Sequence, residues 1–168
     1  MRRLVLLLTA MALSLLVASG VALAVIKTGI DGPDNLLGTK GSDVLSGRGG
    51  TDWIEGRAGN DIISGGPGND SNPAQSRASG MLDGGPGADV ISGGRGHDTL
   101  KGGPLVDSAV DILEGGDGDD MLHANNRPAA RDIVSCGAGI DEAGVDRKDI
   151  VSDDCEMIYR GGIDHSVG

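Results

Sequence analysis

The feature that most constrains this chain is a nine-residue repeat that runs without a gap from Gly38 to Asp70. Successive units read GTKGSDVLS, GRGGTDWIE, GRAGNDIIS and GGPGND. Each complete unit has glycine at positions one and four, aspartate at position six and a hydrophobic residue at position eight. Repetition at a fixed period predicts a stack of structural units that bury their apolar residues against one another.

The same pattern covers most of the 168-residue chain. Units begin at Gly29, Gly38, Gly47, Gly56, Gly65, Gly84, Gly93, Gly102, Gly115, Ala124, Cys136 and Val145. Extra residues interrupt the pattern near 71–80, 105–110 and 125–131, and the register resumes after each interruption. Such insertions are typical of loops on a stacked scaffold.

Within a unit, the glycine-rich first part predicts a turn and the last three residues predict a short strand. Short strands need neighbours, so the units should stack as parallel strands with position eight facing inward. The inward set is Leu36, Leu45, Ile54, Ile63, Leu82, Ile91, Leu100, Leu113, Leu122, Val134 and Val151. Position seven, which should face outward, is mostly apolar as well; it either favours strand conformation through β-branching or forms a face that packs on a partner or a second roll.

The units GGPGADVIS and GGRGHDTLK resemble the haemolysin-type (RTX) calcium-binding nonapeptide, Gly-Gly-x-Gly-x-Asp-x-U-x, in which U is a large hydrophobic residue. The resemblance covers roughly residues 29–151. It implies an all-β fold, a right-handed parallel β-roll, in which Ca²⁺ ions lie between turns that stack on the same edge.

The residue types support calcium independently of the resemblance. Ca²⁺ takes six to eight oxygen ligands, and glycine-rich turns supply carbonyls while position six supplies carboxylates. Mg²⁺ requires a stricter octahedron, and Zn²⁺ favours histidine and cysteine ligands. The candidate metal ligands are Asp34, Asp43, Asp52, Asp61, Asp70, Asp89, Asp98, Asp107, Asp111, Asp120 and Asp141.

Alternate units should share an edge of the roll. The first edge then carries Asp34, Asp52, Asp70, Asp98, Asp120 and Asp141, and the second carries Asp43, Asp61, Asp89, either Asp107 or Asp111, and Asp132. The turns on the second edge lose their pattern at Gly102 and Ala124. We therefore predict about five ions on the first edge, about two on the second and none beside Asp132.

Composition agrees with a role for bound cations. The chain has 31 glycines, no phenylalanine and a net charge of −11, which by general rules would leave it disordered. Burial of about a dozen aliphatic side chains falls short of the backbone entropy lost on folding, so ladders of backbone hydrogen bonds and a ligand must contribute. The acidity favours calcium ions over nucleic acid as partners.

Residues 1–24 have the features of a secretory signal peptide: Arg2 and Arg3, an apolar stretch, and small residues before a cleavage point after Ala24. We expect a secreted, extracellular protein that has no membrane attachment after cleavage. The alternative is an uncleaved membrane anchor, since about 20 apolar residues can span a bilayer. Residues 25–28 would form a short lead-in to a roll over residues 29–135.

Two cysteines, Cys136 and Cys155, lie near the other end. In an exported chain without a CxxC motif, a disulfide between them is expected, and a reactive thiol pair is the alternative. The disulfide would staple a C-terminal cap over residues 136–158, because the end of a repeat stack needs a cap. Residues 159–168 would form a flexible tail.

No catalytic motif accompanies the repeats: the sequence has no HExxH, no GxSxG and no complete P-loop. We therefore expect a non-enzymatic calcium-binding protein that acts as a structural or surface-interaction module, with self-association or a cell-surface polymer as its interaction. The alternative is an accessory domain that assists an extracellular enzyme acting on polysaccharide or protein.

Overall fold

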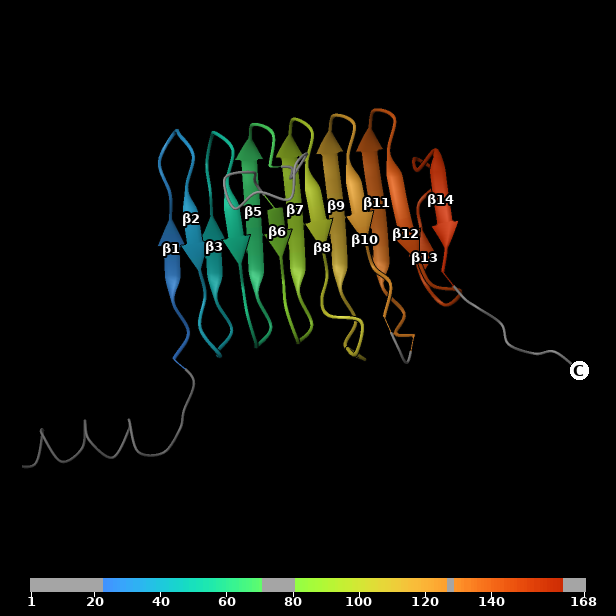
Figure 1. The fold of residues 1–168 in the computed structure, drawn as a ribbon, viewed down its shortest axis with the longest axis horizontal. Coiled ribbons are helices and arrows are strands. Elements are labelled where there is room, and N and C mark those ends of the chain that lie inside the picture. The colour runs from blue at the N-terminus through green and yellow to red at the C-terminus, as the bar shows by residue number, and fades with distance from the viewer. Residues whose placement is uncertain (1–22, 71–80, 127–128, 162–168) are drawn as a thin grey trace, which may run out of the picture.

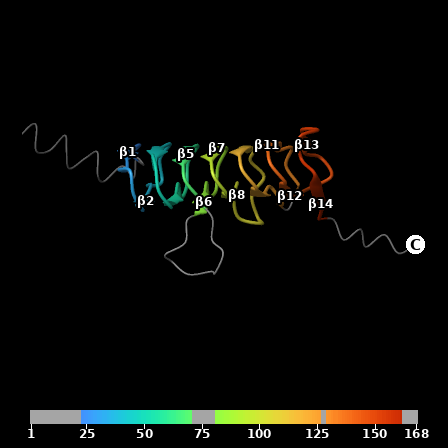
Figure 2. The same ribbon diagram turned by 90° about the horizontal axis from the view of Figure 1, so that it is seen from above.

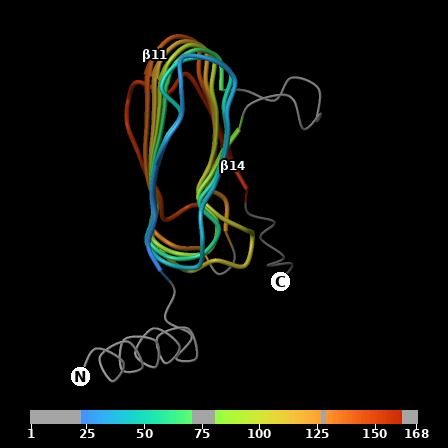
Figure 3. The ribbon, with the colours of Figure 1, turned by 90° about the vertical axis from the view of Figure 1, so that its left-hand side faces the viewer.

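The chain folds into a single roll of parallel strands arranged in two facing sheets (Figure 1). The computed structural model describes residues 23–70, 81–126 and 129–161. Successive strands alternate between the two sheets, so each pass of the chain adds one strand to each sheet. Seen from above, the two sheets form two layers (Figure 2), and seen from the N-terminal end, the coils superimpose as one flattened loop (Figure 3).

The odd sheet contains β1 (Ile26–Thr28), β3 (Val44–Ser46), β5 (Ile62–Pro67), β7 (Val90–Arg95), β9 (Ile112–Asp117), β11 (Ile133–Ala138) and β13 (Ile150–Val151). The even sheet contains β2 (Asn35–Leu37), β4 (Trp53–Glu55), β6 (Met81–Asp83), β8 (Thr99–Lys101), β10 (Met121–His123), β12 (Glu142–Val145) and β14 (Met157–Arg160). Both sheets are entirely parallel, which confirms the predicted β-roll.

The repeat determines the register between strands. Val44 pairs with Ile62, two units later, and Ile62 pairs with Val90 across the 71–80 insertion. Position seven therefore pairs with position seven even where the sequence separation grows. The described insertion residues, 105–110, 125–126 and 129–131, lie outside the strands, as the preserved register predicts.

The core is a double row of position-eight side chains, one row from each sheet. Leu45, Ile54, Ile63, Leu82, Ile91, Leu100, Leu113, Leu122 and Val134 are buried. Leu36 and Val151 stand at the two ends of the stack, where one neighbour is missing, and are only partly buried against this core. The inward orientation of position eight is thus confirmed, while position-seven residues such as Ile62 and Val90 face outward and are exposed.

The roll is longer than the predicted boundaries. Residues 26–28 of the lead-in form strand β1, which pairs with β3. Both sheets also run on past residue 135 to β13 and β14, so residues 136–158 continue the roll instead of forming a separate cap. Tyr159 and Arg160, assigned to the tail, belong to β14. The predicted signal peptide up to residue 22, the 71–80 insertion and the tail from residue 162 lie outside the described residues.

The part of the chain that the structure describes contains no helix long and apolar enough to cross a membrane.

Candidate metal centres on two edges

The glycine-rich turns lie on two edges of the roll (Figure 1). On the first edge, at the top of Figure 1, the chain passes from an odd strand to the next even strand; on the second edge it passes from an even strand to the next odd one. Units that begin at Gly47, Gly65 and Gly93 therefore stack on the first edge. Those that begin at Gly56 and Gly84 stack on the second edge.

On each edge the position-six aspartates form a continuous hydrogen-bonded ladder. The backbone N–H of Asp52 donates to Oδ1 of Asp70 at 2.7 Å, and that of Asp70 donates to Oδ1 of Asp98 at 2.7 Å. The first-edge ladder runs through Asp34, Asp52, Asp70, Asp98, Asp120 and Asp141 to Glu156. The second runs through Asp43, Asp61, Asp89, Asp111, Asp132 and Asp149. The predicted division of the aspartates between two edges is what the structure contains.

The structure resolves the choice between Asp107 and Asp111. Asp111 occupies the ladder, where its backbone N–H donates to Oδ1 of Asp132 at 2.9 Å. Asp107 lies in the loop before β9 and accepts hydrogen bonds from Gly87 N at 3.0 Å and from Ala109 N at 2.9 Å. Both of its oxygens are thus engaged in holding the loop to the neighbouring turn.

The second carboxylate oxygen of most ladder residues has no partner. Among the described residues, buried Oδ2 atoms without a hydrogen bond belong to Asp52, Asp61, Asp70, Asp89, Asp98, Asp120 and Asp141. Burial raises the pKa of Asp70 and Asp89 to about 7, and the charges of neighbouring ladder aspartates add to the increase. A column of buried carboxylates without a counter-charge is costly, so these oxygens require protons or cations.

The turns also present backbone carbonyls to one another. Positions two and four of these turns have positive φ, for example 108° at Gly66 and 144° at Gly68, a conformation that glycine adopts without steric cost. A side chain at Gly94 would collide with the carbonyl oxygen of Gly66, and one at Gly96 would collide with that of Gly68. The carbonyls of one turn therefore face the next turn on the same edge.

Carboxylate and carbonyl oxygens are the donors that Ca²⁺ prefers, and such oxygens line the space between consecutive turns. The buried, unpaired Oδ2 atoms and the facing carbonyls fit a calcium ion between consecutive turns. The ion would supply the positive charge that the ladders lack.

The two edges differ in how many turns have this form. On the first edge, four consecutive turns have positive φ at positions two and four, through Arg48 and Gly50, Gly66 and Gly68, Gly94 and Gly96, and Gly116 and Gly118; in the fifth, φ is positive at Gly137. Among the described residues of the second edge, two turns do, through Arg57 and Gly59, and Gly85 and Gly87. The first edge therefore has more turns of this shape, and the number of ions on each edge stays a prediction.

The first two units are built differently, which the sequence reasoning missed. Asp34 Oδ2 accepts a hydrogen bond from Ile30 N at 2.7 Å, and Asp43 Oδ2 accepts one from Thr39 N at 2.5 Å. The Oδ2 atom of each of these carboxylates therefore has a hydrogen-bond donor within its own turn. The signal was present at position two, because β-branched Ile30 and Thr39 disfavour the positive φ seen in the later turns.

At Asp132, unlike in most of the ladder, a side-chain amide donates a hydrogen bond to the second carboxylate oxygen. Asn126 Nδ2 donates to Asp132 Oδ2 at 3.0 Å, and Asn126 Oδ1 accepts a hydrogen bond from Ala130 N at 2.7 Å. Asp132 Oδ2 thus has a donor without an ion, and the absence of an ion beside Asp132 stays a prediction. Sequence reasoning also missed Asp149 and Glu156, although each directly precedes an apolar pair in its strand, as a position-six residue does.

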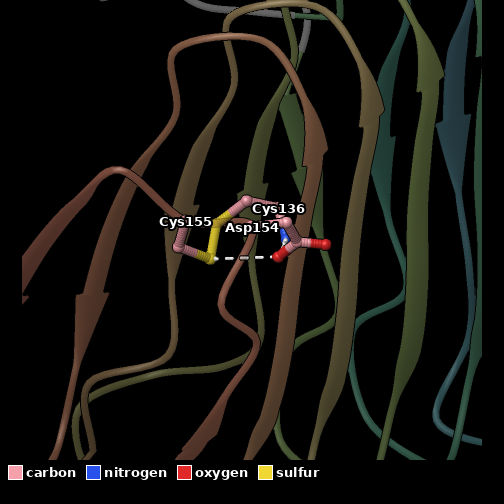
Figure 4. A group of neighbouring side chains, drawn as sticks. All are labelled: Cys136, Asp154 and Cys155. Atoms are coloured by element: carbon pink, nitrogen blue, oxygen red, sulfur yellow. Dashed lines mark hydrogen bonds between the residues drawn. A yellow bond between two sulfur atoms is a disulfide. The ribbon is translucent and has the colours of Figure 1, made fainter.

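Cys136 and Cys155 form the expected disulfide, with Cα atoms 5.1 Å apart (Figure 4). Cys136 occupies position one of its unit, and the bond joins it to the last described turn of the first edge. Asp154 lies beside the bond and accepts hydrogen bonds from Cys136 N and Ser135 Oγ, both at 3.1 Å. Burial favours a higher pKa for Asp154, but these and neighbouring hydrogen bonds outweigh it and lower the pKa. Because the two sulfurs are bonded to each other, this cluster offers no thiolate to a metal.

Comparison with known proteins agrees with the geometry. The profile of a family described as RTX calcium-binding nonapeptide repeat matches four segments, residues 28–63, 37–71, 81–104 and 106–126. No curated protein sequence and no solved structure matches the chain.

Proposed function

Because the chain belongs to the RTX calcium-binding nonapeptide repeat family, we propose that it is an exported protein whose β-roll folds when it binds extracellular Ca²⁺. The observation that carries this proposal is the column of buried Oδ2 atoms that have no partner among the described residues. Ions are expected chiefly between the first-edge turns that carry Asp52, Asp70, Asp98, Asp120 and Asp141. On the second edge they are expected between the turns of Asp61 and Asp89.

Metal binding and folding should be coupled. The ligands of one site come from turns that are 18 or 28 residues apart, so no site exists in the unfolded chain. Binding free energy then becomes folding free energy. In the low calcium of the cytosol the chain would stay unfolded for export, and it would fold outside, where calcium is about millimolar, the range of extracellular modules.

The folded roll would serve as a structural or surface-interaction module. The sequence contains no HExxH, no GxSxG and no complete P-loop, and the buried residues of the described chain form the core and the ladders of the stack. An accessory role beside an extracellular enzyme is the second candidate, and it predicts that the protein binds the polymer on which that enzyme acts.

Circular dichroism during a calcium titration, followed by addition of chelator, tests the folding proposal. Strand signal should appear with calcium, fail to appear with the same concentration of magnesium, and disappear with chelator. The variant Asp98→Asn, which removes one buried ladder carboxylate, should need more calcium. Asp117→Asn, an exposed acid on the same edge, is the matched control and should titrate like the parent. The titration is done at pH 8, above the pKa of about 7 of Asp70 and Asp89, and a strand signal that survives the chelator there would contradict the proposal.

A further inference from the structure

A hollow lies on the outer face of the even sheet, near its C-terminal end. The outward row of this sheet runs in register from Lys101 through His123 and Gly144 to Tyr159. Because Gly144 has no side chain, the row is interrupted between His123 and Tyr159. The resulting hollow of about 310 Å³ is lined by Leu105, Asn125, Asn126, Gly144, Asp146 and Tyr159.

An adjoining hollow of about 220 Å³ shares Leu105 and Asn125 and adds Lys101 and His123. Small-molecule sites usually begin at about 300 Å³. The larger hollow therefore has room for one small ring, and the adjoining one extends the space along the sheet.

Three side chains around this space have hydrogen-bonding groups that are not used within the part of the chain that the structure describes: the Asn125 amide, the His123 ring and the Tyr159 hydroxyl. The Asn125 amide packs closely against two glycines. A Cβ atom added at Gly144 would lie 2.7 Å from Asn125 Oδ1, and one added at Gly161 would lie 3.0 Å from Asn125 Nδ2. Burial lowers the pKa of His123, which favours the neutral ring, and a neutral ring has one donor and one acceptor.

The charges of the lining residues argue against an anionic ligand. Lys101 Nζ is 2.7 Å from Asp83 Oδ2 in an ion pair. Asp146 Oδ2 accepts a hydrogen bond from Asn126 N at 2.8 Å. Among the described residues that line the two hollows, the only cation is Lys101, which is paired. Arg160, which lies beside Asp146, donates to the Asp146 carbonyl oxygen at 3.1 Å. A phosphate or carboxylate group would therefore meet Asp146 without an unpaired cation among these residues.

Two of the lining side chains, Tyr159 and Leu105, give the hollow an apolar part beside its polar groups. Tyr159, the one tyrosine of the chain, is 56% exposed, and Leu105 is 63% exposed. A sugar ring has the complementary chemistry, since its hydroxyl groups donate and accept hydrogen bonds at the rim and its C–H faces pack on aromatic rings.

We propose that this hollow binds a neutral sugar residue, through hydrogen bonds to Asn125, His123 and Tyr159 and contact with the Tyr159 ring. The inference rests on the proposed function, because it names the partner class of the surface-interaction module.

Saturation-transfer NMR on the exported, calcium-loaded chain tests the proposal. The probes are hexamers of β-1,4-glucose, β-1,4-N-acetylglucosamine, β-1,4-xylose and α-1,4-glucose, with oligogalacturonate as the acidic comparison. At least one neutral hexamer should bind, more tightly than oligogalacturonate. Tyr159→Ala and Asn125→Ala should each weaken that binding at least fivefold, because each removes a direct contact. Gly144→Ala should do the same by filling the hollow, and the backbone there accepts alanine without a positive φ.

Trp53→Ala is the matched control: it removes an aromatic side chain from the outer face of the same sheet, in β4, away from the hollow. Its binding should equal that of the parent. Circular dichroism of every sample reports folding separately. Three results would contradict the sugar site while leaving calcium-dependent folding intact. The folded chain binds no neutral hexamer, it binds oligogalacturonate as tightly as the neutral hexamer, or the Tyr159→Ala and Asn125→Ala variants bind the hexamer as tightly as the parent. If the chain folds without calcium, the proposed function is wrong, but sugar binding to the folded chain can still be measured and compared between variants.

Discussion

Gly93→Ala is the substitution that most directly probes the oxygen-lined space between two turns. Gly93 occupies position one of a first-edge unit. A Cβ atom there would lie 2.5 Å from Oδ2 of Asp98 and 2.6 Å from the carbonyl oxygen of Gly115, where ordinary contact begins at 3.4 Å. The φ of Gly93 is not positive, so the backbone itself accepts alanine. The cost therefore comes from displacing a carboxylate and a carbonyl by nearly one ångström.

Overpacking of this kind costs about 1–3 kcal/mol. For a chain of this size, each kcal/mol lowers the Tm by roughly 2–4 °C. The expected fall in Tm is then on the order of 2–12 °C at saturating calcium. Because the displaced carboxylate belongs to a proposed site, the calcium needed for half-maximal folding should also rise.

Thermal unfolding followed by circular dichroism measures this loss, and Gly32→Ala provides the matched control. Gly32 lies at position four of the first unit on the same edge, and an added Cβ would have no heavy atom within 4 Å. That variant should unfold at the parent temperature or slightly above it, since alanine restricts the unfolded chain. If Gly93→Ala and Gly32→Ala melt together, the tight space at position one does not exist as described.

Two further predictions follow from the buried carboxylates. Burial raises the folded-state pKa of Asp70, Asp89 and Asp111 to about 7, above the ordinary 3.8, so the folded state binds these protons more tightly than the unfolded state. The stability that these protons contribute is full below about pH 4 and is lost as the pH rises through about 7. The calcium-free chain should therefore show more strand signal by circular dichroism near pH 5 than near pH 8. Equal signals at the two pH values would contradict the raised pKa values. Asn126→Ala leaves Asp132 Oδ2 buried without its amide donor and should destabilise the calcium-loaded roll by about 1–3 kcal/mol in denaturant unfolding. The number of calcium ions bound, measured by calorimetry, should stay the same in that variant, and a loss of ions would show that Asn126 supports a metal site.

Much of the scaffold follows from the sequence because the repeat is local. Nine residues contain a whole turn and a whole strand, so the position of a residue in its unit already determines whether it faces the core, the edge or the solvent. Leu45 and Ile91 are buried and Asp52 and Asp98 lie in the ladder for this reason alone. The all-β class, the inward row and the division of the aspartates between two edges could therefore be predicted.

Other features depend on neighbours that the repeat does not specify. The loop before β9 places Asp111 in the ladder and leaves Asp107 bonded to Gly87, which only the path of the inserted residues decides. Asp149 and Glu156 extend the ladders although their units have lost the glycines.

The sequence by itself determined the repeat, its inward hydrophobic row and the stacking of acids, because all three follow from a nine-residue period. Only the tertiary structure decided which carboxylates lack a partner. Asp70 Oδ2 has none, whereas Asp34 Oδ2 is capped by Ile30 and Asp132 Oδ2 by Asn126. The physical reason is that the need for a cation depends on which donors reach each oxygen, and those donors are set by the conformation of each turn.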